Sequence, residues 1–128
     1  MDTHTFLWSA SSLADVARLG KFARNAIEDP ESVLFVSPVS LFELSNKYRA
    51  GKLQEYKPVV ENLLEALNGL EAEELPVKWE HANLAGNLDW VHKDPFDRIL
   101  AAQAIIEGMA FITCDKAFEN APGLSIVW

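Results

Sequence analysis

The chain has 128 residues, of which 49% are hydrophobic, and a formal net charge of −8. This length is typical of one domain and the hydrophobic content suffices for a packed core, so we expect a single folded domain over residues 1–128. The negative charge excludes a protein that binds nucleic acid or an anionic membrane through net charge alone. It does not exclude a nuclease, because metal ions can turn a carboxylate cluster into a phosphate-binding site.

The first half of the chain alternates between helical and strand patterns. Residues 12–29 place apolar side chains at helical spacing, and the run VLFV at 33–36 is typical of a strand buried on both faces. A helix is expected over 37–52, with Ser37 as its N-cap and Pro38 in its first turn. A further helix is expected after Pro58, over residues 58–70.

The second half continues this alternation. We expect strands at 73–77, 110–113 and 125–128, a helix at 79–88, and a helix that begins within KDPFDRILAAQA (residues 93–104) and ends at Gly108. The order predicts an α/β fold with a mainly parallel sheet flanked by helices. The opening MDTHTFLW starts where a first strand would be ending, so that strand is expected to be truncated or nearly absent.

No apolar run approaches the roughly 18 residues that a membrane helix needs, and no signal peptide is visible. The single cysteine, Cys114, cannot form an internal disulfide, which fits a reducing compartment. We therefore expect a cytoplasmic protein with no membrane partner.

Acidic residues lie just after the expected strands or in the first turns of the helices that follow. They are Asp2, Glu43, Asp94, Asp97 and Asp115. In an open α/β sheet, ligands bind outside the carboxyl ends of the strands, where these side chains could meet. Carboxylates about 5 Å apart repel by roughly 3 kcal/mol per pair at an effective dielectric near 20, so such a cluster needs a cation or raised pKa values. Oxygen ligands suit Mg²⁺ or Mn²⁺, and the chemistry indicated is hydrolysis of a phosphodiester.

Each acid also has an ordinary structural explanation. Asp94 fits the N-cap of the next helix, with Asp97 in its first turn. Glu43 precedes Lys47 by one helical turn, so this pair could be a surface ion pair worth about 0.3–0.5 kcal/mol. Asp2 could lie in a frayed terminus, and Asp115 could cap a short helix. The set of acids is therefore more informative than any single member.

Four stretches of the sequence together resemble the PIN domain family, and in particular its VapC-type toxins. They are MDTHTFLW, VSPVSLFELSNKYRAGKL, HKDPFDRILAAQAIIEGMAFITCDKAF and IVW. The resemblance runs nearly end to end, and its most specific parts are the DPFDR helix start and the Thr-x-Asp at 113–115 that follows it. It implies a metal-dependent ribonuclease that hydrolyses RNA with Mg²⁺ or Mn²⁺. It also implies inhibition by a cognate antitoxin protein, and a homodimer.

The resemblance assigns roles to individual residues. It implies that the catalytic, metal-binding acids are Asp2, Glu43, Asp97 and Asp115, with Asp94 and Thr113 in support. Thr113 is expected to form a hydrogen bond with a carboxylate or a water. Only Met1 precedes Asp2, whereas the family has several apolar residues there, in a strand at the middle of the sheet. We expect that the natural start lies upstream or that residues have been trimmed.

Several other residues could have either a functional role or a purely structural one. Lys47, Lys93 and Arg98 could contact RNA; alternatively Lys47 and Lys93 are solvated, and Arg98 pairs with a neighbouring acid. Trp8 and Phe42 belong to an aromatic cluster that could be core, and the resemblance makes them candidates for partner contact.

The histidines and the cysteine are expected to be ordinary. The histidines lack metal-ligand spacing; they are His4, His81 and His92. His92 is expected in a solvated loop, although it could touch an RNA phosphate. Cys114 has no visible base partner, so packing is favoured over nucleophilic catalysis.

Two other functions compete with the ribonuclease. A phospho-acceptor signalling domain also gathers acids around Mg²⁺, but it needs adjacent acids after its first strand and a lysine after its last, and neither is visible. The chain could also be a catalytically impaired binding module, because the truncated start weakens the positioning of Asp2.

Overall fold

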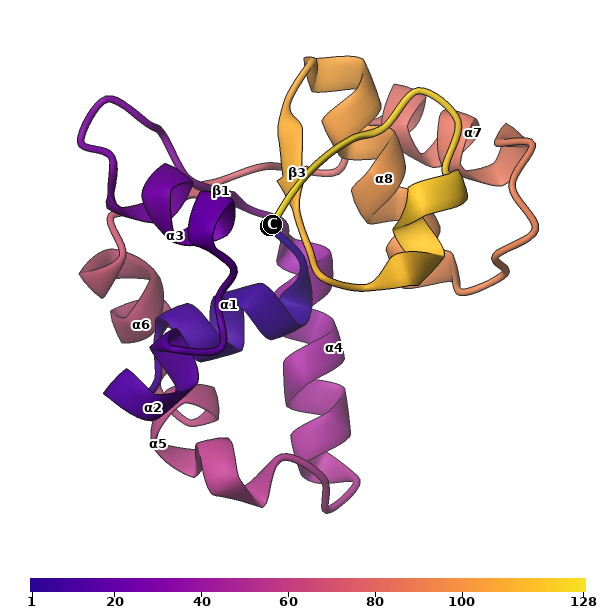
Figure 1. Ribbon diagram of the computed structural model, residues 1–128. Helices are drawn as coiled ribbons and strands as arrows, with labels where there is room; N and C mark the ends of the chain where they lie inside the picture. Colours follow the sequence, from indigo (N-terminus) through magenta and orange to yellow (C-terminus); the bar gives the residue numbers. More distant parts are fainter.

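The computed structural model describes residues 1–128 and contains two short parallel sheets surrounded by helices (Figure 1). In one sheet, β1 (Phe35–Val36) pairs with β2 (Glu73–Glu74); in the other, β3 (Ala110–Ile112) pairs with β4 (Ser125–Val127). The expected α/β class with parallel strands is confirmed. The sheet itself is divided into two pieces, which the sequence pattern did not indicate.

Short helices fill most of the N-terminal half. They are α1 (Thr3–Ser9), α2 (Leu13–Val16), α3 (Lys21–Glu28), α4 (Pro38–Arg49), the 3₁₀ turn η1 (Gln54–Tyr56), α5 (Lys57–Val60) and α6 (Leu63–Gly69). The helix expected over 12–29 is divided before Gly20, where a Cβ atom would lie 2.6 Å from Cδ1 of Trp128. The C-terminal tryptophan therefore packs where only glycine fits. The helix expected over 58–70 is divided at Asn62, whose side chain donates to the Pro58 carbonyl.

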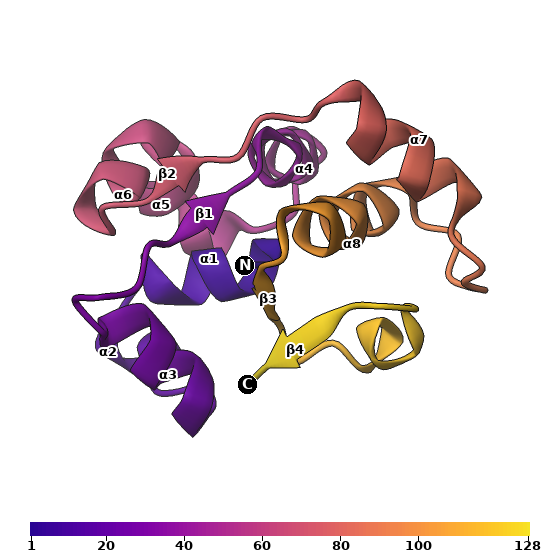
Figure 2. The same ribbon diagram turned by 90° about the horizontal axis from the view of Figure 1, so that it is seen from above.

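The C-terminal half is built around one long helix. It contains α7 (Trp79–Asn87), α8 (Pro95–Glu107) and the 3₁₀ turn η2 (Lys116–Asn120). Helix α8 packs against α7, α4 and β3 (Figure 2). It ends as predicted at Gly108, which adopts the left-handed conformation with φ 64°. None of the helices is long and apolar enough to cross a membrane.

Helix α1 was not predicted from the sequence. It begins directly after Asp2, which caps it, and the fully buried side chains of Phe6 and Leu7 join a core with Val36 and Leu44. Burial of these apolar side chains, rather than a periodic pattern, fixes the helix against α4.

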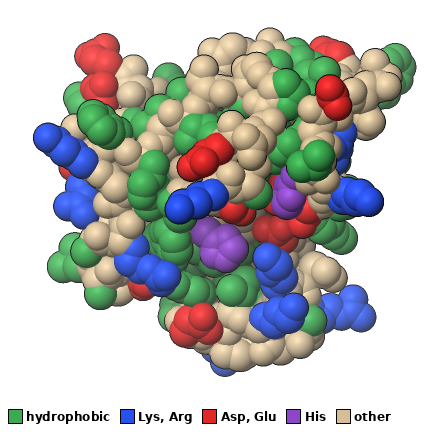
Figure 3. Space-filling model, turned by 45° about the vertical axis from the view of Figure 1, so that its right-hand side comes forward, with side chains coloured by type: hydrophobic (Ala, Val, Ile, Leu, Met, Phe, Trp, Pro, Cys, Tyr) green, Lys and Arg blue, Asp and Glu red, His purple; other side chains and the backbone are tan.

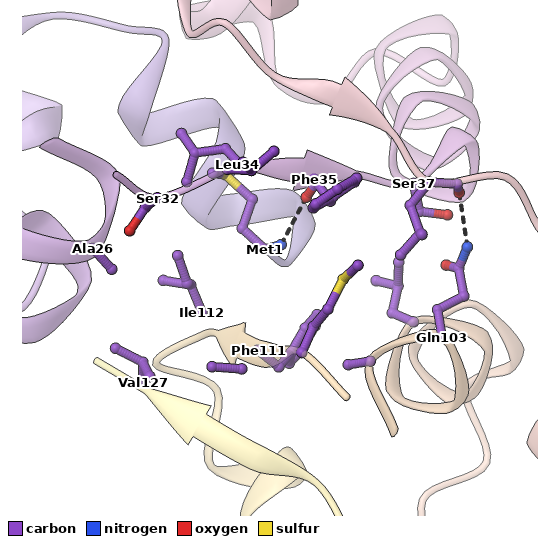
Figure 4. Close-up of a pocket in the computed structure, with 16 residues that line it drawn as sticks. Met1, Ala26, Ser32, Leu34, Phe35, Ser37, Gln103, Phe111, Ile112 and Val127 are labelled. Atoms are coloured by element: carbon purple, nitrogen blue, oxygen red, sulfur yellow. Dashed lines mark hydrogen bonds between the residues drawn. The ribbon is translucent and has the colours of Figure 1, made fainter. Parts of the chain in front are cut away.

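A gap separates the two sheets, and the start of the chain enters it. The Met1 amino group donates to the Phe35 carbonyl of β1 at 3.2 Å, and the Asp2 amide donates to the Ile112 carbonyl of β3 at 3.0 Å. A cavity of about 260 Å³ with mostly apolar walls continues the gap (Figure 4). Met1 and Asp2 thus bond to the strands on both sides, as a central strand does. As expected, no full strand precedes α1.

Burial of the Met1 amino group makes the stability of a chain that begins at this residue depend on pH. Burial lowers its pKa from 8.0 to about 6, although the neighbouring Asp2 carboxylate acts in the opposite direction. The unfolded chain therefore binds more protons than the folded one between pH 6 and 8, and stability rises with pH in this window. Since one pKa unit corresponds to about 1.4 kcal/mol, the gain approaches about 2–3 kcal/mol.

Urea unfolding at pH 5.5 and 8.5 measures this gain. Protein acetylated at the Met1 amino group has no titrating amine, so the difference between the two proteins isolates the effect. An equal pH dependence with and without the acetyl group would contradict it.

Candidate metal centre

Three carboxylates meet where α4 and α8 pack together. Oxygen atoms of Glu43, Asp94 and Asp97 all lie within 4.8 Å of one another. Glu43 is only 9% exposed and belongs to the helix that follows β1, whereas the two aspartates open α8. Figure 3 shows acidic side chains gathered between histidines on this face, with Lys and Arg side chains around them. We call these three residues the acidic triad.

Asp94 has two roles in the local structure. Its Oδ1 accepts hydrogen bonds from the backbone amides of Phe96 at 2.9 Å and Asp97 at 3.3 Å, so the predicted N-cap is confirmed. Pro95 occupies the first turn, where its missing N–H is not needed. Both bonds end on the same oxygen, so Asp94 can cap the helix and still offer Oδ2 to a ligand.

The surroundings of Asp97 disfavour its charged form. Burial is the main cause that raises its pKa, and the negative charges of Asp94 and Glu43 act in the same direction. His92 Nε2 lies 2.6 Å from Asp97 Oδ2, and this contact lowers the pKa without overcoming burial. A cation bound between the carboxylates would offset their repulsion and stabilise the charged form of Asp97.

One lysine reaches the triad. Lys47 Nζ lies 3.6 Å from Glu43 Oε1, so the predicted ion pair one helical turn along α4 is confirmed. Such a pair contributes only a few tenths of a kcal/mol when it is partly exposed. A single lysine cannot balance three carboxylates, which leaves this region negative apart from any charge on His92.

A second acidic group lies at the end of β3. The Thr113 hydroxyl donates to Asp2 Oδ2 at 2.5 Å and accepts from the Asp115 amide at 3.0 Å. Asp2 Oδ1 accepts from the Thr5 amide at 2.8 Å, and Asp2 is 6% exposed. Asp2 is therefore a fixed helix cap rather than a frayed terminus. Asp115 is exposed and caps η2 by accepting from Ala117, so the short helix considered for it is confirmed.

The two groups of acids share one end of the fold. The start of α1, the start of α8 and the segment after β3 lie together beside α4 (Figures 1 and 2). The structure thus brings Glu43, Asp94 and Asp97 into close contact. Asp2 and Asp115 are instead linked to each other through Thr113.

The donor atoms at this end suit a hard divalent cation. Carboxylate oxygens dominate, and Mg²⁺ and Mn²⁺ prefer such ligands. Cys114 is exposed, which corrects the expectation of a packing role. Partial burial, and then the Asp2 carboxylate, raise the pKa of its thiol, which disfavours the thiolate. The residues present therefore fit Mg²⁺ or Mn²⁺ better than zinc.

Arg98 forms no ion pair with an acid, which corrects one of the two expectations for it. Its Nε donates to the Ala85 carbonyl, Nη1 to those of Trp90 and His92, and Nη2 to that of Leu88, at 2.7–2.8 Å. The guanidinium group thereby holds the end of α7 and the loop before α8. This loop places His92 against Asp97.

Replacement of Arg98 by lysine is expected to lower the free energy of unfolding by about 2 kcal/mol. Lysine keeps the charge but cannot reach four carbonyls with one ammonium group, and a charged hydrogen bond is worth about 1.5–3 kcal/mol. Urea unfolding measures the loss, with Arg49→Lys at the exposed end of α4 as the matched control. Equal stability of the Arg98→Lys and Arg49→Lys variants would contradict this role.

The remaining candidate residues lie in varied surroundings. Trp8 is half-buried, with the Arg18 guanidinium 4.4 Å from its ring centroid and Trp128 at 5.9 Å. Phe42 and Lys93 are exposed, so both remain available to a ligand or partner.

Two histidines make specific side-chain contacts. His81 is fully buried, accepts from the Lys78 amide and contacts Glu107 at 2.9 Å, so its role is structural. The contact of His92 with Asp97 was not predicted from the sequence. His92 precedes Asp97 by five positions across an irregular loop, where no periodic pattern signals a contact.

Comparisons with known proteins agree with this geometry. Residues 2–124 match the PIN domain family. The fold is similar to that of a chain from the crystal structure of VapBC2 from Rickettsia felis bound to a DNA fragment from their promoter. There the TM-score is 0.69 and the identity 17%, over 97% of this chain and 92% of that chain.

A chain from the structure of DNA-bound VapBC from Salmonella typhimurium is similar with a TM-score of 0.65 and 22% identity, over 98% of this chain and 92% of that chain. No curated protein sequence matches. Because the family match extends over nearly the whole chain, and the similar solved chains have the same fold, the chain belongs to the PIN domain family.

Proposed function

We propose that the chain is a metal-dependent endoribonuclease, the toxin component of a toxin–antitoxin pair. The observation that carries this proposal is the acidic triad, whose three carboxylates lie within 4.8 Å of one another with one lysine beside them. Membership of the PIN domain family supports a nuclease. The fold similarity to chains from VapBC structures supports the narrower assignment to a toxin.

The acids would have different roles in binding Mg²⁺ or Mn²⁺. Glu43 and Asp97 are the proposed primary ligands, with Asp2 and Asp115 completing the site and Asp94 in support. When bound, such an ion lowers the pKa of a coordinated water and stabilises negative charge on a phosphate. Thr113 orients Asp2 through its hydroxyl hydrogen bond.

The chain's own cations would help RNA approach this negative region. Lys47 lies beside Glu43, and Lys93 is exposed immediately before Asp94. Each contributes a local positive charge in a protein whose net charge is −8. Arg98 acts indirectly, by fixing the loop that carries His92.

The proposed partner is a cognate antitoxin protein. The two solved chains named above come from structures described as VapBC, bound to DNA. A protein that inhibits this chain would have to cover the acidic end of the fold or displace its cation. We also propose that the protein acts in the cytoplasm and forms a homodimer, as expected from the resemblance to VapC-type toxins.

The activity can be tested with purified protein and a pool of mixed RNA in Mg²⁺ or Mn²⁺. We expect discrete cleavage that stops on addition of a chelator and returns with excess Mn²⁺. Intact RNA in the presence of folded, metal-supplied protein would contradict the proposal. So would cleavage that continues in the chelator.

A further inference from the structure

A pair of aromatic rings lies beside the acidic triad. Phe42 on α4 is 59% exposed, and its ring centroid is 5.6 Å from that of Phe96 on α8, with the rings tilted by 54°. Phe42 directly precedes Glu43, and Phe96 directly precedes Asp97. The pair therefore opens to solvent at the edge of the triad, with the half-buried Phe96 supporting the exposed ring.

Positive charges flank the same edge. Lys47 approaches Glu43 from further along α4, and the exposed Lys93 lies just before the start of α8. Proteins that bind single-stranded nucleic acid combine cations along the backbone path with aromatic rings on which bases stack. The surroundings of the triad contain both elements.

The surface around Phe42 does not suit a docked protein helix. Such a helix lays its own apolar residues, spaced three, four and seven positions apart, into a continuous hydrophobic groove. On α4 the positions that follow Phe42 at these spacings are Ser45, Asn46 and Arg49, all exposed and polar. The exposed surface of α4 beyond the ring pair is therefore polar and offers no continuous groove for such a helix.

We propose that Phe42, supported by Phe96, stacks against one unpaired nucleobase of a single-stranded RNA whose phosphate lies at the triad. This inference rests on the proposed function and adds a base contact to it. Bases in a duplex are already stacked and paired, so only single-stranded or looped RNA presents a free base face. The contact uses the face that every base has, so it selects strandedness rather than a given base.

The test measures binding apart from cleavage. A fluorescein-labelled single-stranded RNA 12-mer of mixed sequence is titrated with protein in Ca²⁺, which accepts oxygen ligands, and gels verify that the RNA stays intact. Phe42→Ala is expected to weaken binding about tenfold, in line with the value of stacking one base. Phe42→Trp, which keeps an aromatic face, should bind as wild type. Phe22→Ala is the matched control, since Phe22 is 66% exposed on α3.

A set of RNA 12-mers with one abasic nucleotide each locates the base. At one position the missing base should weaken binding to wild type about tenfold and have little further effect on Phe42→Ala, because both changes remove the same contact. The proposal would be overturned if, at every RNA position, the loss of affinity from the missing base and the loss from Phe42→Ala simply add. The same 12-mer annealed to its complement should bind Phe42→Ala and wild type equally.

Other outcomes separate this inference from the proposed function. RNA cleavage by wild type, with equal RNA affinity of Phe42→Ala, overturns the base contact and leaves the ribonuclease intact. Binding that depends on Phe42 without any cleavage overturns the ribonuclease alone. Loss of a co-expressed antitoxin from Phe42→Ala, with unchanged RNA affinity, would make the ring pair a protein contact. Wild type that binds no RNA would overturn both.

Discussion

Asp97→Asn is expected to lower the kcat/KM of RNA cleavage by at least about a hundredfold. Asparagine has nearly the same shape as aspartate but lacks the negative charge that a cation needs. Residues that only support metal ligands already change activity about 10–100-fold when they are replaced, so a ligand should have a larger effect. The change is measured with a fixed RNA at saturating Mn²⁺.

The matched control for this variant is Asp89→Asn. Asp89 is an exposed acid in the loop after α7, outside the acidic triad. The Asp89→Asn variant should cleave RNA with the same kcat/KM as wild type. Equal kcat/KM for Asp97→Asn and Asp89→Asn would contradict the assignment of Asp97.

The second large effect is a reversal in thermal stability. Without metal at pH 7, Asp97→Asn is expected to be more stable than wild type. Burial and the charges of Asp94 and Glu43 raise the pKa of Asp97 in the folded state, so stability falls as pH rises through the window above its ordinary pKa. The neutral asparagine avoids this penalty, which amounts to about 1–3 kcal/mol for each repelling pair.

Metal should reverse the order. A cation that binds only the folded state adds about 2.7 kcal/mol at a hundred times its dissociation constant, and the gain requires Asp97. Thermal melts in EDTA and in Mn²⁺ measure both differences. A lower melting temperature of Asp97→Asn in EDTA, or equal Mn²⁺-dependent shifts in both proteins, would contradict the account.

The sequence predicted those elements whose ends are set by local chemistry. Ser37 and Pro38 open α4, and Asp94 and Gly108 bound α8, as expected from capping preferences. Three of the four strands were placed by apolar runs, whereas β2 consists of Glu73 and Glu74. Each strand is shorter than predicted. Capping residues and apolar runs depend on a few neighbouring residues, so they can be recognised without knowledge of the fold.

Features set by distant contacts were missed. The break before Gly20 depends on Trp128, more than a hundred positions away, and α1 depends on burial of Phe6 and Leu7. The division of the sheet follows from the gap that Met1 only partly fills. Sequence periodicity carries no information about such packing.

Part of the candidate site could likewise be predicted from the sequence, and part could not. The rule that ligands gather at the carboxyl ends of strands selected all five acids, and the structure brings Glu43, Asp94 and Asp97 together. The roles of Arg98 and His92 could not be predicted, because both depend on the irregular loop between α7 and α8. Arg98 contacts four carbonyls of α7 and this loop, which only the folded chain reveals.

The measurement that tests the central claim most directly is Mn²⁺ binding followed by electron paramagnetic resonance of the free ion. Wild type and Asp89→Asn should bind Mn²⁺ with the same affinity, and Asp97→Asn should bind it at least about tenfold more weakly. Equal affinity in all three proteins, or no binding to wild type, would contradict a metal centre at the acidic triad.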